Sequence, residues 1–306
     1  MIPLPPNPND SELLASEQSD LEAETRWLLN EEFDGLVAEL NREFDCFGSE
    51  RIRSVFYAQP RVHAVVLRLN TCFAYIAEDD AGKCAGETLA LTTKSSEVLK
   101  GYVTLCGPQL TKGEIMATMP KHARGYPTHT IISAQQPYPM PQIADLKESI
   151  QVLRVVTESL AKPDSLDQGK EAARCLLDHL NNTMAILKPK EELLFPKQPS
   201  YEDSFEPALV DTLSIGFHLD ADNLIAEVRA LKFHATPPVR YRSLIHGWVE
   251  PPQVHTYNGR LAEVLDSIVV VSTVPSLKAI WASLCASHAL SSAYREKLIA
   301  VQEAGR

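Results

Sequence analysis

Glycine is scarce in this chain, with 13 residues among 306. Cofactor-binding loops use glycine where backbone must approach a ligand closely. The sequence has neither a Gly-x-x-x-x-Gly-Lys phosphate loop nor a Gly-x-Gly-x-x-Gly dinucleotide turn. It also lacks a Gly-x-Ser-x-Gly hydrolase elbow and a His-Glu-x-x-His zinc helix. We therefore assign no catalytic, cofactor-binding or metal-binding residues and expect a protein that is not an enzyme.

Long apolar runs are missing as well. Without a run of about 18 apolar residues, a membrane-spanning helix is excluded. The N-terminus, MIPLPPNPNDSELL, has neither the basic lead nor the apolar core of a signal peptide. We expect a cytoplasmic protein.

Cysteine pairs at metal-site or redox spacing do not occur. In a cytoplasmic chain, scattered cysteines without a CxxC pair are predicted to be reduced and mostly buried. The six are Cys46, Cys72, Cys84, Cys106, Cys175 and Cys285.

Basic residues are rare at the start of the chain. Residues 1–50 hold thirteen Asp and Glu against Arg26 and Arg42, whereas the other 256 residues balance at 27 acidic and 27 basic. This excess of negative charge disfavours nucleic-acid binding. Two interpretations of the acidic segment remain open: it attracts a basic protein partner, or it is a solvated helix face.

The same segment carries the first helical pattern, over residues 19–47. Ser19 or Asp20 can cap its start, and Gly48 is a plausible stop. Residues 1–17 are predicted to be a disordered tail. The apolar positions form a seam that another part of the chain must cover. They are Leu29, Phe33, Leu36, Leu40 and Phe47.

A β-rich pattern follows over residues 52–133. Its predicted strands are spaced as a meander, which favours an antiparallel or mixed sheet. They fall at 62–76, 88–92, 98–105, 114–118 and 129–133, with a turn at 78–83 and a proline-rich exit at 135–141.

Helical periodicity returns at 143–160, ends before Pro163, and resumes at 166–187, which together predict a helical hairpin. Residues 191–207 look like a loop. The run 212–219 alternates like a strand, and after the turn at 220–223 the run 224–233 fits a helix or a strand equally well. The turn residues favour a hairpin. Residues 237–252, with Trp248, look irregular.

The last predicted helix spans 266–301. Pro275 should either kink it or start a new helix. Its seam repeats every 3.5 residues, and two small serines in its middle would let another helix approach closely. The seam is Leu277, Ile280, Leu284, Ser287, Ser291, Tyr294, Leu298 and Val301.

These elements predict an α+β fold with two domains. Both termini and the central hairpin form an antiparallel helical bundle of 18–48, 141–190 and 262–306. The two β-rich stretches, 49–140 and 203–261, share a β domain with an antiparallel or mixed sheet.

Weak chemical signals have plain structural explanations. Cys106 could act as a nucleophile with His122 or His129, although nothing in the sequence places them together. His246 and His255 flank Trp248 in a proline-containing loop, and His288 is expected at the edge of the bundle. Acidic pairs at 79–80 and 191–192 belong to solvated turns.

Several segments together resemble the Rogdi family, known also as the second subunit of the RAVE complex, a regulator of V-ATPase assembly. The segments occur in the family's order and span most of the chain. They are RWLLNEEFDGLVAEL (26–40), LKGYVTLCGPQLTKGEIMATMP (99–120), FEPALVDTLSIGFHLDADNLIAEVRAL (205–231) and the terminal helix with Pro275.

This resemblance implies an elongated, non-enzymatic cytosolic factor that helps the peripheral sector of the V-ATPase rejoin its membrane sector, and so supports vacuolar or endosomal acidification. It also implies peripheral recruitment to those membranes, with a large β-propeller RAVE subunit, the V-ATPase peripheral sector and a small ubiquitin-ligase adaptor as partners. Although the family is labelled a leucine zipper, four helices within one chain favour packing inside a monomer.

Two other hypotheses stay open from the sequence. One is a self-associating coiled-coil scaffold in which terminal seams pair between chains. The other is a small-molecule enzyme that uses Cys106.

Overall fold

The computed structural model describes residues 8–45, 86–92, 98–122, 125–238, 241–243, 247–249 and 251–305. Its chain divides into two compact units. The described parts of the first, which we call the helical unit, are 8–45, 148–185 and 282–305. The second, the sheet unit, holds the described residues between 86 and 147 and those between 186 and 281. The division falls within α4 and α6 and before the last residue of α5, so these three helices contribute to both units.

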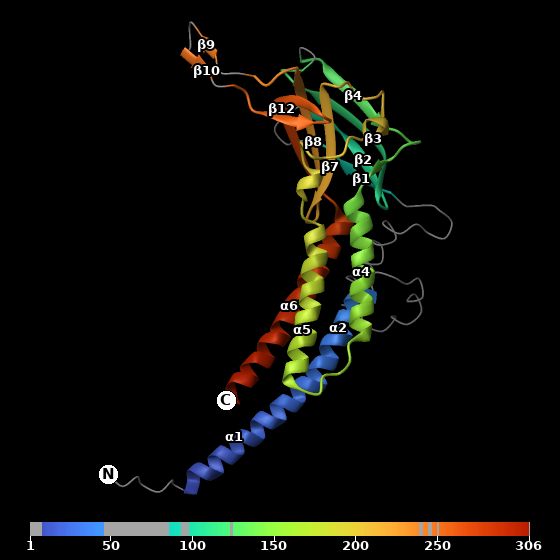
Figure 1. Ribbon diagram of the computed structural model, residues 1–306. Coiled ribbons are helices and arrows are strands. Elements are labelled where there is room, and N and C mark those ends of the chain that lie inside the picture. The colour runs from blue at the N-terminus through green and yellow to red at the C-terminus, as the bar shows by residue number, and fades with distance from the viewer. Residues whose placement is uncertain are drawn as a thin grey trace. The chain divides into compact units, whose positions relative to one another are not determined.

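Helices dominate the first unit (Figure 1). The chain enters it through α1 and α2, which a π-helical turn, η1, joins. The helices α4 and α5 follow each other in sequence, and α6 completes the unit. The bounds are α1 Pro8–Trp27, η1 Leu28–Glu32, α2 Phe33–Asp45, α4 Pro141–Ser159, α5 Leu166–Ile186 and α6 Pro275–Ala304.

The four described positions of the first predicted seam and all positions of the second are buried within the single chain. In η1 and α2, the side chains of Leu29, Phe33, Leu36 and Leu40 are at most 8% exposed. All eight predicted seam positions of α6, from Leu277 to Val301, are buried. The periodicity of the sequence therefore predicted both faces correctly, because a helix repeats its contacts every three to four residues.

Polar contacts tie α6 to its neighbours in the helical unit. In the first half of α6, Ser283 Oγ donates to Glu43 of α2. Towards the end of α6, Lys297 pairs with Glu32 of η1. On the α5 side, Lys170 Nζ donates to Gln302 Oε1 at 2.5 Å. The start of the η1–α2 path and the start of α5 contact the end of α6, and the end of α2 contacts an earlier part of α6. The helix α6 therefore runs antiparallel to both α2 and α5.

The sheet unit contains two larger sheets and a two-stranded ribbon, with every strand pair antiparallel. One sheet has the order β1-β2-β3-β4-β6, with β5 beside β3, and the other has the order β11-β12-β8-β7. Mixed helix and antiparallel sheet confirm the α+β class. The bounds are β1 Glu87–Ala90, β2 Leu99–Cys106, β3 Gln109–Thr118, β4 Pro127–Ile132, β5 Tyr138–Pro139, β6 Phe205–Glu206, β7 Leu213–Asp220, β8 Asn223–His234, β9 Tyr241–Ser243, β10 Gly247–Val249, β11 Val254–Tyr257 and β12 Arg260–Thr273.

An aromatic cluster fills part of the sheet unit's core. The ring of Tyr138 makes edge contacts with Tyr201, Phe205 and Phe217 at centroid distances of 4.9, 6.0 and 5.0 Å. Edge-to-face geometry is the arrangement that aromatic quadrupoles favour. The hydroxyl of Tyr138 also accepts the backbone N–H of Phe217 at 3.2 Å, so its polar end is satisfied inside the core.

The predicted hairpin over 212–233 is confirmed. The strands β7 and β8 pair from Leu213 opposite Ala230 to Asp220 opposite Asn223, around a two-residue turn. Ala221 in this turn has a φ of 53°. Pro275 begins α6, which confirms the second of the two roles predicted for it.

Three predictions need correction. The first helix begins at Pro8, so residues 8–17 are helical and not a tail. Residues 260–273 form β12, not the start of the terminal helix and bundle; its run Ile-Val-Val-Val is β-branched, and such side chains favour strands. Within the supposedly irregular 237–252, β9 pairs with β10, with Trp248 opposite Arg242. The predicted strand at 62–76, the turn at 78–83, the acidic pair at 79–80, Phe47 and the stop at Gly48 lie outside the described residues.

Candidate interaction surface

The Cys106 hypothesis is contradicted by the structure. Cys106, at the end of β2, is disulfide-bonded, so it offers no thiolate, and the prediction that all cysteines are reduced is wrong for this residue. The two candidate bases have other contacts. His122 Nε2 lies 2.9 Å from Thr212 Oγ1, and His129 Nε2 lies 2.9 Å from Glu114 Oε1. Cys175 and Cys285 are free thiols.

The remaining histidine and acidic candidates have structural surroundings. His255 lies in β11 with its ring 5.5 Å from that of Phe195, while His246 is outside the described residues. His288 is half-buried on α6, and Glu191 and Glu192 are exposed in a short helical turn. Within the described ranges, no three His, Cys, Asp or Glu residues are grouped closely enough to hold a metal ion.

A largely buried polar cluster lies on one face of the β11-β12-β8-β7 sheet, beside a small hydrophobic cluster that includes Leu231 and Tyr257. Arg229 pairs with Glu227, and its guanidinium carbon lies 5.0 Å above the centre of the Phe195 ring. Gln198 Nε2 donates to Ser214 Oγ at 2.8 Å. Burial lowers the pKa of nearby His218, which keeps its imidazole neutral. These contacts attach the segment around residues 195–198 to the sheet, so we interpret the cluster as structural.

The elements α1, η1 and α2, which we call the first helical path, change register at η1. Leu28 and Leu29 are adjacent in sequence, yet their side chains are only 1% and 8% exposed. A π turn inserts one residue into the helical repeat, and this lets two successive leucines face the core. The seam continues in α2 from Phe33. The inserted residue could not be predicted from the periodicity of the sequence, because the insertion itself interrupts the helical repeat.

Tyr294 of α6 packs against this turn. Its ring centroid lies 5.9 Å from that of Phe33, and its hydroxyl donates to the backbone oxygen of Leu28 at 3.4 Å. Burial, with Glu32 nearby, raises the pKa of Tyr294 to about 12. The close packing extends to α5, where a Cβ on Gly169 would lie 3.1 Å from a methyl of Leu298.

A groove lies between α2 and the connection from α4 to α5. Its volume is about 380 Å³. Among its lining residues Phe33 is buried, Val37 is half-buried, and Ala38 is exposed. Asp34 and Lys162, which also line it, form an ion pair of 2.9 Å between Oδ2 and Nζ. We call this feature the α2 groove; its lining residues are Phe33, Asp34, Val37, Ala38, Asn41, Leu160 and Lys162.

Negative charge accompanies the groove along the first helical path. From residue 8 to 45 the sequence has twelve acidic residues and two arginines. Ion pairs satisfy Glu32, Asp34 and Glu39. A further set is exposed and makes no ion pair within the described part of the chain: Glu17, Asp20, Glu22, Glu24 and Glu31.

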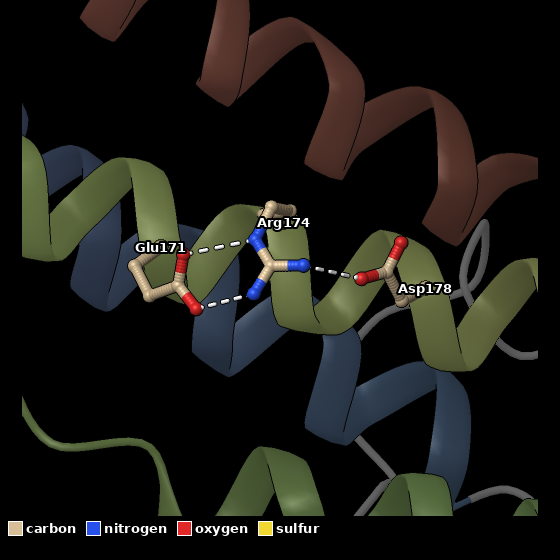
Figure 2. Close-up of polar contacts among 3 residues, drawn as sticks. All are labelled: Glu171, Arg174 and Asp178. Atoms are coloured by element: carbon tan, nitrogen blue, oxygen red, sulfur yellow. Dashed lines mark hydrogen bonds and ion pairs between the residues drawn. The ribbon is translucent and has the colours of Figure 1, made fainter.

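The exposed side of α5 is different, because its charges are largely paired with one another (Figure 2). Arg174 binds Glu171 through Nε at 2.9 Å and Nη2 at 2.5 Å, and it reaches Asp178 through Nη1 at 2.9 Å. The hydrogen bonds to Glu171 raise the pKa of Arg174 and lower the pKa of Glu171. The acidic field of the helical unit therefore comes from α1, η1 and α2 and not from α5.

Fold and surface together define a two-unit α+β protein whose helix seams are used internally and whose first helical path remains exposed and acidic. Comparison with known families agrees with the resemblance seen in the sequence. Residues 57–247 match the family described as Rogdi leucine zipper containing protein. This match covers more than half of the chain, and the chain belongs to the Rogdi family. No curated protein gives a significant match.

None of the described helices contains a stretch that is long and apolar enough to cross a membrane. The buried seams of α2 and α6 lie outside the matched residues 57–247.

Proposed function

We propose that this protein is a non-catalytic subunit of a RAVE-type complex, which promotes assembly of the V-ATPase peripheral sector with its membrane sector and thereby supports vacuolar or endosomal acidification. Membership of the Rogdi family is the observation that carries this proposal. Rogdi is not a known enzyme family, and the disulfide at Cys106 removes the nucleophile of the competing enzyme hypothesis.

The mechanism in this proposal is scaffolding. The buried seams give the helical unit the character of an antiparallel bundle, whose fixed outer surfaces hold a larger subunit in place. The partners are a large β-propeller subunit and the V-ATPase peripheral sector, with a small ubiquitin-ligase adaptor as a further component. The protein acts from the cytoplasm and is recruited peripherally to vacuolar or endosomal membranes.

Affinity purification of the tagged full chain from its native organism tests the proposal. We expect to recover a large propeller-bearing subunit together with V-ATPase peripheral subunits. Deletion of the gene should reduce the fraction of peripheral sector found on membranes and raise vacuolar pH. Recovery of neither partner class, or full V-ATPase assembly without the gene, would overturn the proposal.

A self-associating coiled coil is the competing hypothesis. Its terminal seams would need to be available for a second chain, but they are buried within one chain. Light scattering on the purified protein separates the two: we expect a monodisperse monomer, whereas a concentration-independent dimer would favour the coiled-coil scaffold.

A further inference from the structure

We propose that the α2 groove is a docking site for a basic amphipathic helix of a partner protein. This goes beyond the V-ATPase role and does not rest on it, because the groove and its charge belong to the chain itself. The partner is recognised by its chemistry, which is two or three apolar side chains on one helix face beside a lysine or arginine.

The shape of the groove suits a helix. Its α2 wall is made by positions 33, 34, 37, 38 and 41, which lie on one face and extend over roughly 12 Å of helix at 1.5 Å per residue. Ala38 is small and exposed, and next to this wall Gly35 has open space where a Cβ would be. A second helix can therefore approach the α2 backbone closely, as helices that bind in grooves do.

The volume of the groove limits what can enter. At about 380 Å³ it exceeds twice the roughly 150 Å³ cavity that accommodates one benzene. Two or three apolar side chains, spaced three and four residues apart on one helix, would fill it. Val37 and Leu160, which are both half-buried in the groove lining, would provide apolar contacts for them.

Charge selects a basic partner. Asp34 is 62% exposed although it pairs with Lys162, and exposed pairs of this kind are weak. A partner's cation can take the place of Lys162 at Asp34. The exposed Glu31 of η1 lies three residues before Asp34 at the start of α2, so a second cation has a partner about one turn away. An acidic helix would meet repulsion from both carboxylates.

Fluorescence anisotropy with two synthetic peptides tests the proposal on the full chain. The probes are an amphipathic Leu/Lys helix of about 18 residues, which makes five turns, and the same peptide with Glu in place of Lys. Ala38→Trp fills the groove. Ala23→Trp places the same indole on exposed α1, away from the groove-lining residues, and serves as the matched control.

We expect the basic peptide to bind the wild type and Ala23→Trp equally, and Ala38→Trp about tenfold or more weakly. The acidic peptide should bind the wild type about tenfold or more weakly than the basic one. Equal binding of the basic peptide to both tryptophan variants would overturn the proposal, because attraction would then be unspecific. No binding of the basic peptide to the wild type would also overturn it.

A second variant covers the case in which Ala38→Trp does not fold. Asp34→Lys changes an exposed side chain. We expect it to weaken binding of the basic peptide and to strengthen binding of the acidic peptide. A photo-crosslinker at position 38 of the full chain, expressed in its native organism, should react with a basic helical segment of another protein. Reaction with an extended or acidic segment would contradict the proposal.

Discussion

The side-chain amide of Gln142 binds both backbone groups of Leu219. Its Oε1 accepts the N–H of Leu219 at 2.7 Å, and its Nε2 lies 3.2 Å from the carbonyl oxygen of the same residue. The same nitrogen is within 3.0 Å of Ile186 O and 3.2 Å of Lys188 O. One buried amide in the first turn of α4 thus joins the end of α5 to β7.

This contact protects the edge of a sheet, because β7 is the last strand in the order β11-β12-β8-β7. Edge strands present unpaired backbone groups that invite other strands. The N–H groups of Phe217 and Leu219 point away from β8 and are satisfied by Tyr138 and Gln142. Two side chains therefore replace the missing neighbouring strand.

Replacing Gln142 should destabilise the sheet unit. Gln142→Leu removes an acceptor and a donor, and leaves the buried backbone groups of Leu219 without partners. The loss should be about 3 kcal/mol in the free energy of unfolding. Gln151→Leu, at an exposed position of the same helix, is the matched control and should change stability by less than about 0.5 kcal/mol. Urea denaturation followed by circular dichroism measures both, and equal midpoints would contradict the role given to Gln142.

Leu36→Asp tests whether the α2 seam is an internal core. Leu36 is 7% exposed, so the variant places a carboxylate among apolar side chains of the helical unit. The expected loss of stability is roughly 3–5 kcal/mol. Ala23→Asp on exposed α1 is the control and should melt like the wild type. Wild-type melting of Leu36→Asp would mean that this seam faces a partner instead of the core.

Periodic features of the fold could be predicted from the sequence. The prediction of the α6 seam was correct from Leu277 onward, because a buried helix face repeats at a fixed spacing. The prediction of the β7–β8 hairpin was correct because residues 212–219 alternate and the turn that follows them is polar. The start of the terminal helix was wrong, because a helical repeat does not show where a β-branched run such as 268–271 takes over.

Features that depend on distant residues could not be predicted in this way. Lys162 and Asp34 lie 128 residues apart, and Gln142 and Leu219 lie 77 residues apart, so neither pair leaves a local pattern. The disulfide of Cys106 is hidden for the same reason, since spacing along the chain does not determine which cysteines meet. The acidic excess before residue 50 was the one signal in the sequence that pointed to the groove region.

Two glycines in helices of the same unit should respond to substitution in opposite ways. A Cβ at Gly169 would lie 3.1 Å from Leu298 and 3.4 Å from Leu29, whereas a Cβ at Gly35 has nothing within 4 Å. Gly169→Leu should therefore destabilise the protein by about 1–3 kcal/mol through overpacking. Gly35→Ala should stabilise it by about 0.5–1 kcal/mol, because alanine favours the helix. Thermal melting compares the two, and stabilisation by Gly169→Leu would contradict the close approach of α5 to α6.

The phenol of Tyr294 makes stability depend on alkaline pH. Its pKa is raised from 10.0 to about 12 in the folded protein, mainly by burial. The stabilisation is complete below pH 10, where both states keep the proton, and it declines as pH rises towards about 12, because the unfolded chain ionises first. Tyr294→Phe cannot ionise, so it should lose less stability over this interval than the wild type. Urea denaturation at pH 8 and pH about 11 gives the free energy of unfolding of each protein, and so its loss of stability between the two pH values. An identical loss in the wild type and in Tyr294→Phe would show that the hydroxyl is open to water and not held against Leu28.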